Sequence, residues 1–201
     1  GGGSPAMVGY LASAFTLAGA NIYNTFRLRE RTISEAPPVP YAAPRLSMPL
    51  YVLTSARTGS AAESFAYTLG NAGRAVVVGT PTAGAANPGG EVDAGHGFRV
   101  FVSTGTPISP ITGRNWEGVG VQPHVATDAA QALATAHILA LEAVLASGLP
   151  AAEAVDTRWA LEALRAEAGP LRAVAWQDYL GDYGTVGIDQ AEGRLRVRRG
   201  E

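Results

Sequence analysis

The stretch LYVLTSARTGSAAESFAYTL, residues 50–69, decides the fold because a strand, a turn and a helix follow one another in it. The apolar run Leu50–Thr54 predicts a buried strand. Apolar residues then recur at 61, 62, 65, 66 and 69, which is the spacing of one helical face. Ser60 lies directly before that face and so occupies the N-cap, where backbone N–H groups have no partner within the helix.

Ser60 has a structural and a chemical interpretation. With Glu63 it forms a capping box, in which a serine and a glutamate three residues later satisfy the free N–H groups of a helix start. The same N–H groups can instead hold a developing oxyanion, and the small neighbours Gly59 and Ala61 allow a substrate to approach. Glycine directly precedes the serine, so this is not the Gly-x-Ser-x-Gly elbow of α/β hydrolases. The local pattern leaves capping and nucleophilic attack both open.

The residues after this unit predict a second strand. The segment Arg74–Gly79 is apolar over its four central residues, which is typical of a parallel strand covered on both faces. The two strands and the helix at 60–70 together predict a strand–helix–strand unit, so we expect an α/β fold.

Helices and short strands are expected around that unit. A serine before Pro5 predicts a helix over residues 5–18, and five prolines predict an extended loop at 36–49. The other expected elements are a solvated strand at 26–33, an antiparallel strand at 98–103, helices at 128–147 and 151–168, and short strands joined by tight turns between 179 and 198.

Composition excludes several functional classes. The 201 residues are 47% hydrophobic and 16% charged, which indicates a folded core, and the net charge of −2 gives no general attraction to nucleic acid. No apolar run is long enough for a membrane span. The chain has no cysteine and no lysine, which excludes a cysteine nucleophile, a thiolate metal site and a Ser–Lys dyad. We expect no cofactor, and no metal site because no two of the three histidines have ligand spacing.

Four segments, taken in order, resemble one family. They are GGGSP at 1–5, LTSARTGSAAE at 53–63, GRAVVVGTPTAGA at 73–85 and NWEGVGVQP at 115–123. Together they resemble the tail-specific (C-terminal-processing) serine peptidase family, and within it the branch shared with tricorn protease and interphotoreceptor retinoid-binding protein. The resemblance covers residues 1–127 and implies a crotonase-like α/β fold, with a βαβ core of parallel strands followed by helices and a small C-terminal β appendage.

The resemblance also implies roles for individual residues. Ser60 would be the catalytic nucleophile, and the N–H groups of Ala61 and of Gly2 or Gly3 would form the oxyanion hole. Without the family, the opening glycines indicate a plain turn. Glu117 falls where the tricorn-like branch has its catalytic glutamate, although the residue alone could equally be an exposed or arginine-paired acid.

The general base of this family is not found in the chain. Members of the Ser–Lys type carry their lysine where this sequence reads AGAA at 83–86, and the histidine of the tricorn-like branch would precede Gly1. Among the histidines present, His96 lies in a glycine turn from which it could approach a cleft. His124 stands where relatives usually carry aspartate, and His137 is predicted to be partly buried in a helix. We therefore expect this chain alone to show little peptidase activity.

The expected function is that of a serine-type peptidase that cleaves peptides or protein C-termini. The alternative is a non-catalytic module that binds a hydrophobic, retinoid-like ligand on the same fold, and a third interpretation is a piece of the enzyme in which Ser60 is idle. The expected divisions are the C-terminal part of a peptidase domain at 1–127, a helical segment at 128–169 and a β appendage at 170–201. The sequence does not decide whether a homo-oligomer forms. Relatives tend to be extracytoplasmic, but no targeting signal is present.

Overall fold

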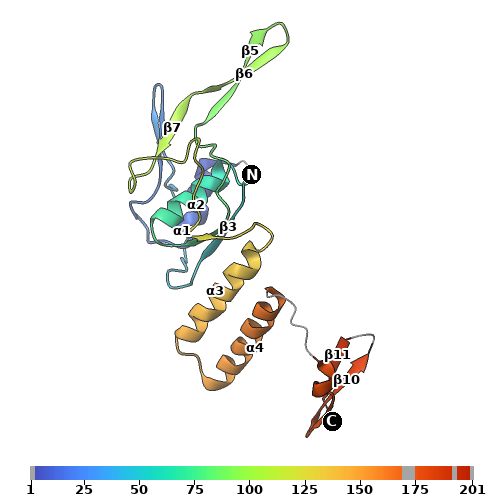
Figure 1. Cartoon of the computed structure of the whole chain (residues 1–201). Coiled ribbons are helices and arrows are strands. Elements are labelled where there is room, and N and C mark those ends of the chain that lie inside the picture. The colour runs from blue at the N-terminus through green and yellow to red at the C-terminus, as the bar shows by residue number, and fades with distance from the viewer. Residues whose placement is uncertain (1–2, 169–174, 192–193, 200–201) are drawn as a thin grey trace. The chain divides into compact units, whose positions relative to one another are not determined.

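The computed structural model describes residues 3–168, 175–191 and 194–199 of the chain (Figure 1). Contacts divide the chain into two units, Gly1–Arg165 and Ala166–Glu201. No helix in these described ranges is both long enough and apolar enough to cross a membrane.

The first unit is a mixed α/β structure built from short elements. Its strands are β1 Thr25–Leu28, β2 Thr32–Ser34, β3 Tyr51–Thr54, β4 Val76–Gly79, β5 Gly89–Gly95, β6 Phe98–Ser103, β7 Gly105–Ile108 and β8 Val125–Ala126. Its helices are α1 Pro5–Ser13, α2 Ala61–Asn71, α3 Ala132–Ala146 and α4 Ala151–Ala168, of which α4 continues into the second unit.

The predicted strand–helix–strand unit is confirmed. Strands β3 and β4 pair in parallel from Tyr51↔Val76 to Thr54↔Gly79, and β8 adds a third parallel strand beside β4. Helix α2 connects β3 to β4 and buries Leu69 and other apolar side chains in the core. The apolar run of β4 is buried, as expected for a parallel strand covered on both faces.

Two antiparallel assemblies lie outside this parallel sheet. One has the strand order β2-β1-β7, and the other is the hairpin β5-β6, which extends away from the body of the first unit in Figure 1. The prediction of one strand at 26–33 is wrong, because the chain turns back between β1 and β2. The N–H of Leu28 donates to the carbonyl of Arg31 at 2.9 Å and closes that turn.

Two of the predicted helices are shorter than expected. Helix α1 ends at Ser13, whose hydroxyl donates to the Tyr10 carbonyl at 2.6 Å and competes with continued helix formation. Helix α3 starts at Ala132 because a turn, closed by the Gln131 N–H on the Asp128 carbonyl at 2.8 Å, precedes it.

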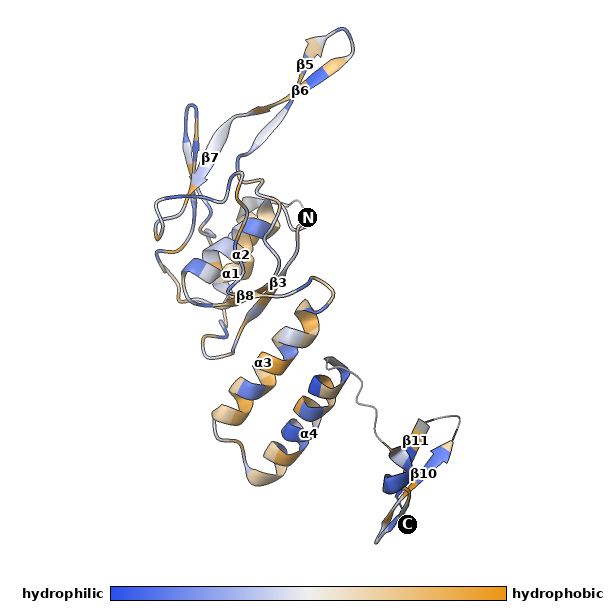
Figure 2. Ribbon diagram, viewed as in Figure 1, coloured by the Kyte–Doolittle hydropathy of each residue, from blue (hydrophilic) through white to orange (hydrophobic). Residues whose placement is uncertain are grey.

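The prediction for His137 is also wrong. Helix α3 is apolar over most of its length (Figure 2). Its fully buried residues are Ala132 and Ala136, which lie on the side of the helix that packs against Val78 of β4. His137 follows Ala136 by one residue, which rotates it away from that contact, and its side chain is exposed.

The second unit contains a small antiparallel sheet, as the sequence predicts. Its elements are a 3-10 helix at Trp176–Tyr179 and the strands β9 Gly181–Tyr183, β10 Val186–Ala191 and β11 Arg194–Arg199, in the order β11-β10-β9. Gly193, expected in its last turn, lies outside the described residues.

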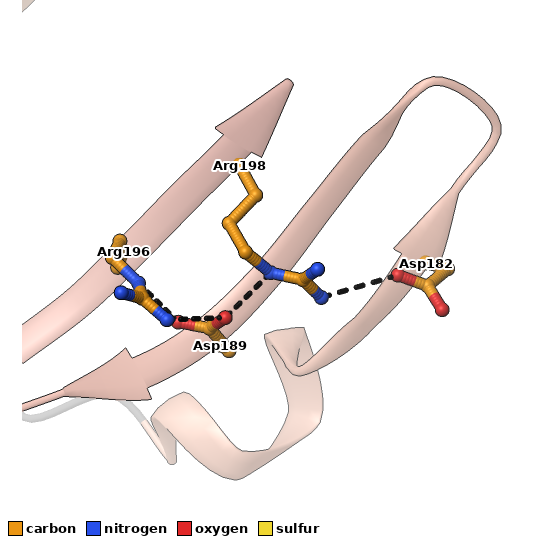
Figure 3. A network of polar contacts seen from close by, with 4 residues as sticks. All are labelled: Asp182, Asp189, Arg196 and Arg198. Carbon is orange, nitrogen blue, oxygen red and sulfur yellow. Dashed lines mark hydrogen bonds and ion pairs between the residues drawn. The ribbon is translucent and has the colours of Figure 1, made fainter. Parts of the chain in front are cut away.

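Within this sheet, Asp189 accepts a hydrogen bond from Arg196 at 2.8 Å and pairs with Arg198 at 2.6 Å (Figure 3). The hydrogen bond from Arg196 is the main cause that lowers the pKa of Asp189. Because these groups are exposed to solvent, the pairs add little stability.

His124 has a structural role at the start of β4. Its Nδ1 accepts the N–H of Val77 at 2.9 Å. We expect His124→Ala to lower the free energy of unfolding by about 1–2 kcal/mol, since the Val77 N–H loses its acceptor. His124→Asn should restore most of that loss, because its side-chain oxygen can accept the same bond. Urea unfolding of the three proteins measures this, and equal stability of the alanine variant and the wild type would contradict it.

Candidate active site

Ser60 lies at a sharp turn between β3 and α2, in a backbone conformation that residues other than glycine rarely adopt. Its φ is 55° and its ψ is −123°. Such a conformation stores about 1–3 kcal/mol of strain. Ser60 is exposed, and its hydroxyl has the capping-box arrangement without a well-aligned hydrogen bond to the first turn of α2. The hydroxyl is therefore accessible to a reactant, on a strained strand-to-helix turn comparable to that of α/β hydrolases.

Glu63 holds this turn in place from the inside of the protein. Its carboxylate is fully buried and accepts the Ser60 N–H at 2.7 Å. It also accepts two backbone N–H groups of the 82–85 loop, at 2.6 and 3.0 Å, and the hydroxyl of Thr82. The Thr82 oxygen in turn accepts the Val121 N–H at 2.6 Å. One buried acid thus connects the Ser60 turn with the 82–85 loop and the segment before β8.

A cavity of about 110 Å³ opens beside Ser60. Its lining consists of Gly3, Phe26, Glu35, Ser60, Ala61, Ser64, Ala86, Pro88 and Trp116. A Cβ atom placed on Gly3 would lie 3.2 Å from the Ala61 Cβ, so Gly3 directly contacts the start of α2. The structure thus brings Ser60, Ala61 and Gly3 together. Gly2, the other predicted oxyanion donor, lies outside the described residues.

Glu117 lies on the loop whose Trp116 forms one wall of this cavity. The Glu117 side chain is exposed, and its Oε2 accepts the N–H groups of Ala86 and Asn87, both at 2.8 Å. Its Oε1 has no hydrogen-bond partner among the residues that the structure describes. The bonds to Oε2 therefore fix the carboxylate, while Oε1 can accept a hydrogen bond from a further donor.

The histidines do not gather at Ser60. His96 occupies the exposed tip of the β5-β6 hairpin with a φ of 53°, between two glycines that also have positive φ. His124 binds the backbone of β4, and His137 is exposed on α3. In the described part of the chain, no histidine lines the cavity beside Ser60.

A second, larger cavity shares Gly3 and Ala61 with the first. Its volume is about 660 Å³, and its walls are mostly apolar: Gly3, Ser4, Met7, Val8, Leu11, Val52, Leu53, Ser55, Arg57, Thr58, Ala61, Ala62 and Phe65. Both cavities therefore meet at the two residues expected to supply oxyanion donors.

Sequence reasoning missed a buried polar cluster behind Ser60. Glu35 is fully buried and accepts hydrogen bonds from Asn24, Ser64 and Thr68. Burial is the main cause that raises the pKa of the Glu35 carboxyl above its ordinary value. A signal was present, since Ser60, Ser64 and Thr68 recur every four residues and so form one polar face on a largely apolar helix.

Comparison with known proteins places the chain in a family. A model of peptidase family S41 matches residues 1–127. Among solved structures, a candidate peptidase from Parabacteroides merdae aligns with a TM-score of 0.51 and 22% identity, over 64% of this chain and 42% of that one. The photosystem II D1 C-terminal processing protease aligns with a TM-score of 0.48 and 22% identity, over 64% of this chain and 32% of that one. The chain thus spans less than half the length of either protein. Since the family model covers well over half of the present sequence, the chain belongs to peptidase family S41.

Proposed function

We propose that this chain contributes the nucleophile and the oxyanion hole of a serine peptidase, with residues 1–127 as the C-terminal part of its catalytic domain. The observation that carries the proposal is the exposed, strained Ser60 at the N-terminus of α2, on a cavity shared with Ala61 and Gly3. Backbone N–H groups at a helix N-terminus are suited to stabilise negative charge on oxygen.

The reaction is acyl transfer. The Ser60 oxygen attacks the carbonyl carbon of the scissile peptide bond, and the negative charge moves to the carbonyl oxygen, which the N–H groups of Ala61 and of Gly2 or Gly3 bind. The proton of the hydroxyl passes to a general base and then to the leaving amine. Water subsequently hydrolyses the acyl-serine ester and regenerates Ser60.

The general base is a histidine supplied by the polypeptide upstream of Gly1, and Glu117 orients it. Oε1 of Glu117 supports this role: it has no hydrogen-bond partner in the described ranges, and the two backbone N–H groups bound to Oε2 fix the carboxylate without occupying it. Glu117 would thus act as the acid of a catalytic triad, which orients the histidine and stabilises its charged form.

An activity-based probe tests the proposal directly. A fluorophosphonate should phosphonylate the full-length protein with loss of fluoride, and peptide mapping by mass spectrometry should find the adduct on Ser60 and on no other serine. Ser55, which is five residues away and follows β3, serves as an internal control. Absence of an adduct, or an adduct on another serine, would contradict the assignment.

The larger cavity favours a second candidate function. Its apolar walls and its volume of about 660 Å³ are suited to a hydrophobic ligand of the retinoid kind. On this alternative the module binds a ligand without catalysis. Titration with retinol, followed by ligand fluorescence, distinguishes the two: saturable binding by a protein that no fluorophosphonate labels would favour the carrier.

A further inference from the structure

Glu35 is a buried acid that the proposed reaction does not use. It directly follows β2, and its side chain is fully buried. Its Oε2 accepts from the Asn24 Nδ2 at 3.0 Å and from the Thr68 hydroxyl at 3.2 Å, and its Oε1 accepts a hydrogen bond from the Ser64 hydroxyl. These partners are uncharged. The structure therefore surrounds the carboxyl with polar groups but gives it no cation in the described ranges.

Glu35 contacts both helices on which the proposed site depends, α1 through its backbone and α2 through its side chain. Helix α1 begins two residues after Gly3, and a Cβ atom on its Gly9 would lie only 1.8 Å from the backbone carbonyl oxygen of Glu35. Ser64 and Thr68 lie one and two turns after Ser60 on the same face of α2. Residue 35 is therefore held between the helix behind the oxyanion loop and the helix that starts at the nucleophile.

Glu35 and Ser64 are among the residues that line the same 110 Å³ cavity as Ser60 and Ala61. Desolvation by burial is the largest influence on this carboxyl and raises its pKa, against the hydrogen bond from Ser64 and weaker ones that lower it. Burial of a carboxylate without a counter-charge favours the protonated form.

The charged and titratable groups on the surrounding elements are engaged elsewhere. On α2, Glu63 binds the 82–85 loop, and on the loop after Trp116, Glu117 binds the N–H groups of residues 86 and 87. Arg27 on β1 is exposed. Helix α1 has no charged residue, and its Tyr10 packs edge-on against Tyr41. None of these groups is a hydrogen-bond partner of the Glu35 carboxyl.

We propose that Glu35 is a positioning residue for Ser60, which acts through its hydrogen bonds with Ser64 and Thr68 of α2 and fills this role best when its carboxyl is uncharged. This inference rests on the proposed peptidase function. Ionisation of Glu35 puts an uncompensated negative charge beside the cavity in which the oxyanion develops, and like charges disfavour each other at short range. Acylation of Ser60 is therefore slower when Glu35 is ionised.

The test is the rate constant of fluorophosphonate labelling of the full-length protein, measured as a function of pH. Glu35→Gln preserves the shape of the side chain but cannot ionise. Its labelling rate constant should lie within about threefold of the wild-type value at acidic pH and should exceed the wild-type value as pH rises. Glu35→Ala leaves Ser64, Thr68 and Asn24 without their acceptor and should label at least about tenfold more slowly. Glu30→Gln, an exposed acid on the same β1-β2 hairpin, should follow the wild type at every pH.

Thermal unfolding provides a second readout that does not depend on chemistry. The raised pKa means that the folded state binds the proton more tightly than the unfolded state, so the stability of the wild type should fall relative to Glu35→Gln as pH rises. A pH-independent ratio of wild-type to Glu35→Gln labelling rates would overturn the inference, as would a Glu35→Gln variant as impaired as Glu35→Ala. If neither the wild type nor Glu30→Gln is labelled, the peptidase function itself fails and the inference fails with it.

Discussion

Replacement of Ser60 by alanine should abolish peptide hydrolysis by the full-length protein. Removal of a serine nucleophile lowers kcat by about 10⁴–10⁶-fold in peptidases whose remaining groups stay intact. The hydroxyl is exposed and makes no well-aligned cap bond, so the free energy of unfolding should change by less than about 1 kcal/mol. Steady-state cleavage of a peptide library, together with urea unfolding, measures both quantities. Turnover near the wild-type rate in Ser60→Ala would assign the nucleophile to another residue.

Ser60→Gly is the matched variant that separates chemistry from strain. It also lacks the hydroxyl and should be equally inactive. Glycine adopts a φ of 55° without the steric conflict of a Cβ atom, so this variant should be about 1 kcal/mol more stable than Ser60→Ala. Equal stability of the two variants would show that the turn at residue 60 is not strained in solution.

Local patterns in the sequence predicted the parts of the fold that depend on neighbouring residues. The apolar runs at 50–54 and 75–78 and the helical spacing after Ser60 correctly gave a parallel pair of strands connected by a helix. The hairpin of β1 and β2 was missed because its turn, Arg29-Glu30-Arg31, contains none of the glycine, proline or asparagine residues that usually mark a reversal. Strand β7 was missed because it contains Pro107, which a sheet tolerates here only because β7 lies at the edge.

In the candidate site, too, local patterns predicted some residues and missed others. Ser60 and Glu63 were found together because the capping box is a local pattern of four residues. The further partners of Glu63 lie about twenty residues away, in a glycine- and alanine-rich loop whose backbone N–H groups carry no sequence signature. The role of Glu35 was missed for a related reason, since its partners Ser64 and Thr68 are separated from it by 29 and 33 residues. Buried polar clusters are made by the tertiary fold, and only the four-residue spacing of the hydroxyls indicated this one.

Loss of the Glu63 carboxylate should have the largest effect on stability. Glu63→Ala leaves three backbone N–H groups, of Ser60, Gly84 and Ala85, and one hydroxyl without their acceptor at a fully buried position. Breaking such a network by removal of its central acid is expected to cost about 3–5 kcal/mol. Glu63→Gln keeps one acceptor oxygen but directs an amide at groups that donate, so its loss should be intermediate.

Glu153 provides the control because it also occupies the third position of a helix, in α4, but is exposed. Glu153→Ala should therefore change the free energy of unfolding by no more than about 1 kcal/mol, the size of a helix-dipole contribution. Urea unfolding compares the variants, and fluorophosphonate labelling of those that remain folded reports on the Ser60 turn. Because Glu63 accepts the Ser60 N–H, the labelling rate of Glu63→Gln should fall by more than its loss of stability accounts for. If Glu63→Ala were as stable as Glu153→Ala, or if folded Glu63→Gln were labelled at the wild-type rate, Glu63 would not be the residue that holds the nucleophile in its strained conformation.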